Sequence, residues 1–551
     1  MKILVEGYTY SDCDLPKKLK ERFFQNEKVA VVGYYNNVET DGSIIILPKV
    51  FVENQLLFGV FPYQDAIESD FIANLKNHSN SNIYLEFLHR FSLLLFLSIK
   101  TYQQRQPDNE IVEKSIISQV KNGKSESEIT EIELIFALID FYKQHRNLVL
   151  FTKAITHNQQ FKKVNWQKTI NKTLPILQQQ TPIYHTVYRT QQTIDFEDEL
   201  MTIYFSLIHY FNENYGFKLY IPKHQRIIRF DDKIKFSEQA LRTLKRIRFK
   251  YFSDKLLRLY KLLKLYFEQI ENAAVSDNKE EFLLVRNYEL VFEDMIDKLL
   301  SDEKQEKELK KHADGKILDH IFEYSSLFQP DSIYYIGDSK FYKETTKYSK
   351  HTICKQHTYA KNVIQYNINL FNDNTLRQQL RYRDDLTEGY NITPNFFIQA
   401  YVELDKLLDF EHHFNSDKSK SVYINQHFEN RLFDRDTLTI HHFKINFLFV
   451  LKSYITLNSK LLYQQKNSFK AFIKQDVKRY YNEHFDFYQI KPLISQEKFM
   501  ERFFKKLIGK IYRNSGNELI FAWRKNMKIE VKRELIILLS QYAEIEDSKQ
   551  I

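Results

Sequence analysis

The sequence predicts a protein of mixed α and β structure whose core is a mixed sheet flanked by helices. Three observations support this fold class: short β-rich runs near the N-terminus, helical spacing of apolar residues through the middle, and two later apolar runs joined by a short loop. With 551 residues the chain is too long for one compact core. We expect a β-containing N-terminal domain at 1–82, a helical, basic middle region at 83–280, the mixed core at 281–410 and a mainly helical C-terminal region at 411–551.

The N-terminal domain is predicted from two β-rich runs at 29–35 and 43–47, which are separated by the turn-forming pairs Asn36-Asn37 and Asp41-Gly42. In the middle region, apolar residues recur at helical spacing. One such stripe consists of Leu256, Leu259, Leu263 and Phe267.

The middle region also contains a basic stretch. Between residues 223 and 264 there are 14 Lys or Arg and four acidic residues. Four of the basic residues fall on adjacent helical positions and form a basic face: Arg242, Lys245, Arg246 and Lys250. This face is either an ordinary solvated surface or a contact for DNA phosphates or an acidic partner subunit, and the basic stretch at 502–533 leaves the same alternatives open.

Composition excludes several classes of function. The 80 Lys and Arg exceed the 71 Asp and Glu and give a net charge of +9, which is compatible with binding a polyanion. The two cysteines can form neither a disulfide framework nor a cysteine-based zinc site, and the sequence contains no secretory signal or membrane-spanning segment. We therefore expect a soluble cytoplasmic protein without a membrane partner.

One short motif resembles a nucleotide site without completing it. Gly123-Lys124-Ser125 matches the end of a phosphate-binding loop, but that loop requires a glycine five positions before the Gly-Lys pair, where Ser118 stands. We therefore expect that this chain binds no nucleotide.

The most informative segment has the pattern of a β-hairpin. Two runs rich in Ile, Phe and Tyr, at 316–324 and 333–342, flank a loop that contains Pro330-Asp331, a pair suited to a turn. In an antiparallel pair the residue numbers of opposed residues have a constant sum. Pairing Tyr324 with Ile333 therefore predicts the register of the whole hairpin.

This register places Asp319 opposite Asp338. Opposed residues point to the same face with Cβ atoms about 5 Å apart, so one divalent cation can contact both carboxylates. Lys340 lies two residues after Asp338 and shares its face. Oxygen ligands favour Mg²⁺, or Mn²⁺, and a metal held beside a lysine can hydrolyse phosphodiester bonds. The alternative is a cross-strand Asp–Lys ion pair in an ordinary sheet.

Asp331 offers a tempting match to a known nuclease signature, since Pro-Asp precedes an Asp-x-Lys sequence. Seven residues of extended strand separate Asp331 from Asp338, roughly 23 Å at about 3.3 Å per residue, which is too far to share an ion. Asp319 is therefore the better first carboxylate.

An apolar helical stripe is predicted upstream, formed by Leu284, Tyr288, Phe292, Met295 and Leu299. Glu289 and Glu293 lie beside it, four residues apart. Either glutamate could reach the paired aspartates, and the alternative is a salt-bridged surface helix.

Several stretches of the sequence resemble the LlaJI family of restriction endonucleases, which is related to the McrC nuclease subunits of the PD-(D/E)xK superfamily. They lie at 288–296 (YELVFEDMI), 314–322 (DGKILDHIF), 335–343 (YIGDSKFYK), 355–362 (KQHTYAKN), 388–397 (EGYNITPNFF) and 431–438 (RLFDRDTL). The segment 44–51 (IIILPKVF) resembles an N-terminal segment of the family.

The resemblance implies a PD-(D/E)xK nuclease core with Asp319 and Asp338 as metal ligands, Lys340 as the catalytic lysine and Glu293 as a supporting acid and ligand. It also implies that Lys343, together with the basic face, contacts double-stranded DNA. A separate McrB-like AAA+ GTPase is the implied partner, on which the N-terminal region would dock.

Two other functions remain open from the sequence. The chain could be a non-catalytic assembly subunit that keeps the fold and binds DNA or a partner. It could also be a stand-alone mobile-element nuclease that needs no motor.

Overall fold

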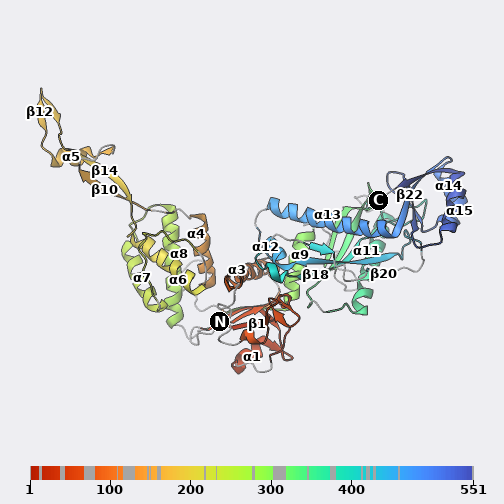
Figure 1. Cartoon of the computed structure of the whole chain (residues 1–551), viewed down its shortest axis with the longest axis horizontal. Coiled ribbons are helices and arrows are strands. Elements are labelled where there is room, and N and C mark those ends of the chain that lie inside the picture. Colours follow the sequence, from red (N-terminus) through yellow and green to blue (C-terminus); the bar gives the residue numbers. More distant parts are fainter. Residues whose placement is uncertain are drawn as a thin grey trace.

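The computed structural model describes residues 2–10, 15–37, 44–67, 81–107, 109–115, 131–145, 148, 150–157, 163–215, 219–230, 232–275, 280–301, 318–343, 346–372, 380–410, 414–416, 422–425, 430–456 and 459–548. Figure 1 shows an elongated arrangement in which a helical unit with a projecting arm lies to one side of a body built mainly from sheets and the helices that cover them. The Asp41-Gly42 turn and the Gly123–Ser125 segment lie outside the described residues.

The N-terminal sheet confirms the predicted strands and adds two from distant sequence. Its order is β1-β5-β4-β15-β9. The strands are β1 (Lys2–Val5), β4 (Val31–Asn37), β5 (Ile44–Leu47), β9 (Val112–Ser115) and β15 (Glu280–Arg286). The expected boundary at residue 82 is therefore wrong, since the chain leaves this sheet and returns to it after the helical unit. Gly33 sits where β4 meets β15, and a Cβ there would lie 2.0 Å from the Leu283 carbonyl oxygen.

Smaller elements complete the N-terminal unit: α1 (Lys17–Phe23), β2 (Phe24–Gln25), β3 (Lys28–Val29), η1 (Lys49–Phe51), β6 (Val52–Glu53), β7 (Leu56–Leu57), β8 (Phe61–Pro62) and η2 (Asp65–Ile67). The long helix α3 (Ser81–Arg105) follows and packs on the body of the molecule. Its buried residues belong to the same hydrophobic core as the N-terminal sheet.

The helical unit has a hydrophobic core of its own. It contains α4 (Glu131–Gln144), α6 (Glu199–Tyr215), α7 (Lys233–Ile247) and α8 (Asp254–Val275). The predicted stripe is confirmed, because Leu256, Leu259, Leu263 and Phe267 are all buried in this core. Asp232 caps α7 by accepting hydrogen bonds from the backbone N–H groups of Ile234 and Lys235.

The middle region consists mainly of helices, and a β-arm that was not predicted is inserted between α4 and α6. The arm consists of β10 (Phe151–His157), β11 (Lys163–Val164), α5 (Trp166–Lys172), β12 (Ile176–Gln178), β13 (Thr181–Ile183) and β14 (Tyr188–Ile194). In Figure 1 it projects away from the helical unit. Its Thr and Ile residues suit paired strands, and the turn Gln179-Gln180 has positive φ angles.

A mixed central sheet forms the core that carries the hairpin. Its order is β16-β17-β18-β21-β19, and β20 also pairs with β21. The strands are β16 (His320–Ser325), β17 (Ser332–Lys340), β18 (Asn395–Tyr401), β19 (Phe414–Ser416), β20 (Tyr423–Asn425) and β21 (Leu438–Asn446). β17, β18 and β21 are parallel to one another, while β16 is antiparallel to β17. The sheet thus continues past the expected boundary at residue 410.

Helices cover both faces of this sheet, as predicted for the core. They are α9 (Tyr288–Leu300), α11 (Lys350–Asn372), α12 (Phe447–Tyr454) and α13 (Ser459–His484), with the short η3 (Leu404–Lys406) after β18. Phe292 of α9 packs against Phe341 just after β17, whereas Gln356 of α11 donates to Asn395 on the other face. Leu284 lies in β15, so the predicted helical stripe begins only at Tyr288.

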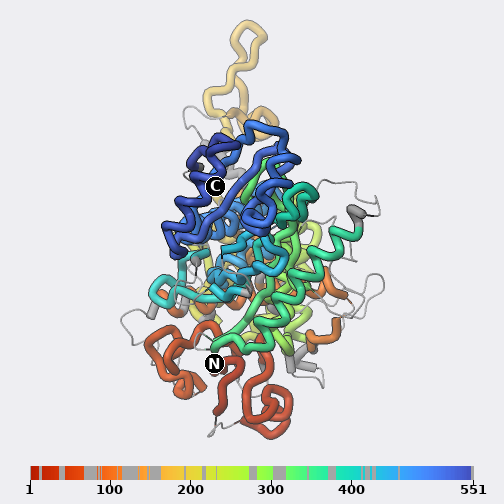
Figure 2. The backbone as a smooth tube through the Cα atoms, turned by 90° about the vertical axis from the view of Figure 1, so that its right-hand side faces the viewer, coloured from red at the N-terminus to blue at the C-terminus, as the bar shows by residue number. Residues whose placement is uncertain are grey.

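The C-terminal region is also less helical than expected, because it ends in a β-α-β-β-α-β unit. The elements are β22 (Phe485–Pro492), α14 (Gln496–Leu507), β23 (Ile511–Arg513), β24 (Leu519–Arg524), α15 (Ile529–Ser540) and β25 (Ala543–Ser548). The strand order is β23-β24-β22-β25, with all neighbours antiparallel. Figure 2 shows this unit and the N-terminal unit at opposite ends of the central sheet.

No helix among the described residues combines the length and apolar character needed to cross a membrane.

Candidate functional site

The hairpin register predicted from the sequence is confirmed. Tyr324 pairs with Ile333, and the ladder between β16 and β17 ends at the pair His320 and Gly337. One step further along the same register, Asp319 lies opposite Asp338. Gly337 fits here because a Cβ at this position would come within 2.5 Å of the Phe396 ring on β18.

Asp319 and Asp338 form a contacting pair of carboxylates. The pKa of Asp319 is raised well above its ordinary value, first by burial, then by the charges of Asp338 and Glu293, and by a hydrogen bond between the two aspartate side chains. Asp319 Oδ2 also accepts a 3.3 Å hydrogen bond from the backbone N–H of Ser339. Two carboxylates in this position either share a proton or require a cation between them.

Lys340 makes an ion pair with the second carboxylate. Its Nζ lies 2.5 Å from Asp338 Oδ2, and both side chains are largely buried. Burial lowers the pKa of Lys340, but the carboxylates of Asp338 and Asp319 outweigh this effect and the net pKa is raised. Lys340 is therefore an ammonium group at neutral pH, suited to neutralising negative charge and not to removing a proton from water.

Glu293 is electrically coupled to the pair from α9. Its pKa is raised to about 7, with burial as the largest cause; within this net shift the charge of Lys340 lowers the pKa and the charge of Asp338 raises it. Glu289, one turn earlier, has an exposed side chain. Of the two glutamates considered from the sequence, Glu293 is thus the one that responds to the hairpin charges.

The donor set fits a hard divalent cation, with two carboxylates in place. Asp338 Oδ2 is buried and is paired with the Lys340 ammonium group, while its neighbour Asp319 carries the raised pKa. Such an oxygen pair is what Mg²⁺ or Mn²⁺ takes as ligands. Within the described ranges no group of three or more His, Cys, Asp or Glu side chains is arranged to hold a metal. The structure therefore brings Asp319 and Asp338 together and leaves Glu293 as a neighbour of that pair.

Asp331 has a different role. It is buried, and its carboxylate accepts hydrogen bonds from the Tyr512 hydroxyl, at 2.5 Å, and from the backbone N–H of Ser515, at 2.8 Å. Both donors belong to the C-terminal unit. Asp331 therefore joins that unit to the hairpin loop, in agreement with its exclusion from the site on strand geometry.

Lys355 was missed by the sequence reasoning. It lies on α11 with an exposed side chain, and its pKa is raised by a hydrogen bond with Tyr359 and by the charges of Tyr359, Asp338 and Asp319. Lys355 is therefore an exposed cation in the electric field of the carboxylate pair. The signal for it in the sequence was its place on the helix that follows the Asp338 strand.

Two glutamines on α11 were further candidates from the sequence, although a surface position was the favoured interpretation for both. Gln356 is instead buried and donates to Asn395. Gln365 is bonded on the surface to Asn369 and Arg435. Gln356 therefore holds α11 against β18, since its hydrogen-bond partner is Asn395 and not one of the two carboxylates.

A shallow cleft lies at the end of the strands beside Lys340. It has a volume of about 70 Å³ and is bordered on the sheet side by Tyr342, Gln399 and Lys444, with β6 of the N-terminal unit opposite. Gln399 is the register partner of Lys340 on β18, and Lys444 is the partner of Gln399 on β21. These polar side chains share the face of the sheet that carries Asp338.

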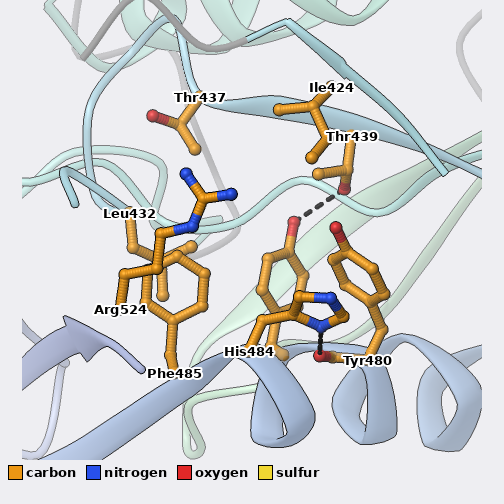
Figure 3. A pocket seen from close by; sticks show the side chains of 9 residues that line it. Ile424, Leu432, Thr437, Thr439, Tyr480, His484, Phe485 and Arg524 are labelled. Atoms are coloured by element: carbon orange, nitrogen blue, oxygen red, sulfur yellow. Dashed lines mark hydrogen bonds between the residues drawn. The ribbon is translucent and has the colours of Figure 1, made fainter. Parts of the chain in front are cut away.

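A second cavity lies away from the carboxylates, where β20 and β21 meet α13 and the C-terminal unit (Figure 3). It holds about 10 Å³ of free space, close to the minimum for one water molecule. Thr439 on one side is hydrogen-bonded to Tyr481, and His484 Nδ1 lies 2.8 Å from the Tyr480 carbonyl. We interpret this cavity as a packing gap.

The predicted DNA-contacting residues fall into two groups. On α7, Arg242, Lys245, Arg246 and Lys250 are exposed. Arg242 pairs with Glu238 on its own helix and Arg246 with Glu199, while Lys250 lies 2.8 Å from the buried carboxylate of Asp198.

Lys343, by contrast, is bound inside the molecule. Its Nζ donates a 2.7 Å hydrogen bond to the Gly7 carbonyl and lies 3.4 Å from the centre of the Tyr8 ring. Burial and the neighbouring Lys28 and Lys49 lower its pKa. Its visible role is to join the N-terminal unit to the segment after β17.

Comparison with models of protein families, with curated proteins and with solved structures found no match to this chain. The family resemblance therefore rests on the residues quoted above.

Proposed function

We propose that this protein is the Mg²⁺-dependent endonuclease subunit of a bacterial restriction system that acts against phage DNA in the cytoplasm. The observation that carries the proposal is the contact between Asp319 and Asp338, with Lys340 paired to Asp338. An ordinary cross-strand ion pair would need one acid and one base. Here two carboxylates are held together at the cost of raising the pKa of Asp319, which is the arrangement expected of a cation site.

Asp319 and Asp338 would hold the cation, which when bound supplies a polarised water and neutralises charge on the phosphate. Lys340 is charged and largely buried beside Asp338, so it would bind a phosphate oxygen as negative charge develops there. Glu293 has a pKa of about 7 and can accept a proton near neutral pH. Lys355 is exposed beside the pair and would contact the DNA backbone.

The substrate would be double-stranded DNA held through its phosphates. Arg242 and Lys245 are exposed on α7, and Lys245 has no ion pair among the described residues. Their unit has its own hydrophobic core, separate from that of the hairpin. DNA bound there would be held in position, but its base sequence would not be recognised, since contacts to phosphates carry no sequence information.

A separate AAA+ GTPase would supply recognition and movement along DNA. The sequence has no complete phosphate-binding loop, since Ser118 stands where the first glycine is required. Energy from nucleotide hydrolysis would therefore come from a partner, docked through the N-terminal unit that Lys343 joins to the hairpin strand.

The test is cleavage of a supercoiled plasmid by the full chain with Mg²⁺, alone and with an added McrB-like AAA+ GTPase and GTP. Asp338→Ala and Lys340→Ala should each lower the rate by about 100-fold or more, because each removes several kcal/mol of charge stabilisation. The control is Asp405→Ala, which removes an exposed carboxylate on η3 and should leave the rate unchanged.

The outcomes separate the three functions. Cleavage that survives both Asp338→Ala and Lys340→Ala would refute the nuclease assignment to this site. Absence of cleavage with every partner, together with retained DNA binding, would favour a non-catalytic assembly subunit. Vigorous cleavage by the chain alone would favour a stand-alone nuclease.

A further inference from the structure

A buried chain of polar side chains lies behind the carboxylate pair. His320 Nε2 is 2.9 Å from Ser339 Oγ, and His320 Nδ1 is 3.5 Å from Asp297 Oδ1. His320 is completely buried and Ser339 is 2% exposed. Asp297 also accepts a short hydrogen bond from the Ser301 hydroxyl. This hydrogen-bonded series of side chains therefore connects α9, β16 and β17.

The order Ser-His-Asp is that of a hydrolase triad, but its burial excludes that role. A nucleophilic serine must touch its substrate. With Ser339 and His320 enclosed between the sheet and α9, no substrate reaches either side chain. These three residues therefore act on the protein itself.

Each of these three residues lies close in sequence to a residue of the candidate site. Ser339 lies between Asp338 and Lys340, and His320 directly follows Asp319. Side chains alternate along a strand, so the Ser339 hydroxyl points to the face opposite Asp338. Asp297 lies four residues after Glu293, one turn along α9.

The hairpin needs support at this point. Its backbone ladder ends at the pair His320 and Gly337, so Asp319 and Asp338 lie one step beyond the last paired residues. Strand ends separate easily, and the two carboxylates repel each other once both are ionised. The bond between His320 and Ser339 crosses the strands at this end, where the Ser339 N–H also donates to Asp319.

We infer that Asp297, His320 and Ser339 are positioning residues that hold Asp319 and Asp338 together as a ready-made cation site. This rests on the proposed function. A carboxylate only accepts, so His320 Nδ1 is placed to donate to Asp297, and in that tautomer Nε2 is placed to accept from the Ser339 hydroxyl. These hydrogen bonds join both strands to α9 and oppose the separation of the strands before a cation binds.

The experiment measures Mn²⁺ binding to the full chain by electron paramagnetic resonance of the free ion, without DNA or nucleotide. Ser339→Ala removes one hydroxyl and should weaken Mn²⁺ binding by roughly tenfold or more, as expected for a group that supports metal ligands. Ser339→Thr keeps the hydroxyl and should bind Mn²⁺ within about threefold of the wild type.

Thr439→Val is a matched control. Thr439 is buried on β21, with its hydroxyl 3.2 Å from His441 Nε2, so the variant also removes one hydroxyl bonded to a histidine of the same sheet. It should lower the melting temperature to a similar degree as Ser339→Ala and change Mn²⁺ affinity by less than about twofold. Equal weakening by both variants would overturn the inference, because the effect would then be general.

Asp338→Asn separates this inference from the proposed function. If the wild-type chain binds Mn²⁺ and Asp338→Asn abolishes binding, unchanged affinity in Ser339→Ala overturns the positioning role alone. If the wild type does not bind Mn²⁺, or binds it equally in Asp338→Asn, both the proposed metal site and the inference are overturned.

Discussion

Glu293 provides a quantitative test of the electrostatics of the site. Its pKa is raised to about 7, first by burial, with Lys340 opposing and Asp338 adding to the effect. A carboxyl whose pKa is raised on folding stabilises the protein fully below its unfolded pKa, and this contribution is lost as pH rises through the folded pKa. Without metal, the region around α9 should therefore lose stability between about pH 4.5 and pH 7.

The magnitude follows from the two pKa values. The interval from the ordinary value of 4.5 to about 7 corresponds to about 3 kcal/mol at about 1.36 kcal/mol per pKa unit. Because the Glu293 side chain is partly accessible to water, we expect about 2 kcal/mol in practice. Glu293→Gln cannot ionise, so the metal-free variant should equal the wild type near pH 4 and exceed it by about 2 kcal/mol at pH 8.

A chain with separate hydrophobic cores need not unfold in one step, so the assay should be local. Hydrogen exchange of peptides from α9 and β17, corrected for intrinsic rates at each pH, gives the free energy of local opening. Glu289→Gln makes the same change on an exposed side chain of α9 and should alter this free energy by less than about 0.5 kcal/mol. A difference between wild type and Glu293→Gln that stays constant from pH 5 to pH 8 would refute the reasoning.

Two further substitutions test other parts of the site. Asp331→Ala leaves the Tyr512 hydroxyl and the Ser515 N–H without their acceptor, so it should weaken the junction with the C-terminal unit by about 2–4 kcal/mol, measured as faster proteolysis between the units. Loss of Mn²⁺ binding in this variant, with the junction intact, would instead make Asp331 a ligand. Lys355→Ala should keep Mn²⁺ binding but reduce the slope of log DNA affinity against log salt by about 1, as for one lost phosphate contact. An unchanged slope in filter binding would mean that Lys355 does not touch the DNA.

The hairpin and its register followed from local sequence, because strand periodicity and a turn determine which residues face each other. Pairing Tyr324 with Ile333 was enough to bring Asp319 opposite Asp338, and the parity of the strand placed Lys340 on the same face. The α8 stripe was predictable for the same reason. Such features depend only on neighbours within about 20 residues.

The architecture depended on contacts between distant segments. β15 joins β4 across more than 240 residues of chain, so no local pattern could show that the helical unit is inserted into the N-terminal sheet. The arm and the C-terminal sheet were missed because their strands pair across intervening helices, as β10 does with β14 and β22 with β24. Local sequence patterns do not reveal such partners.

Some residues of the candidate site could likewise be predicted from local sequence, whereas others could not. The sequence by itself determined the three charged residues of the hairpin, because their placement needs only strand geometry. The tertiary structure decided which of the two α9 glutamates is coupled to them, that Lys355 lies in their field, and that Lys343 is bound to the N-terminal unit. It also decided what holds the carboxylates together, since burial and the meeting of α9 with the hairpin create the link from Asp297 through His320 to Ser339.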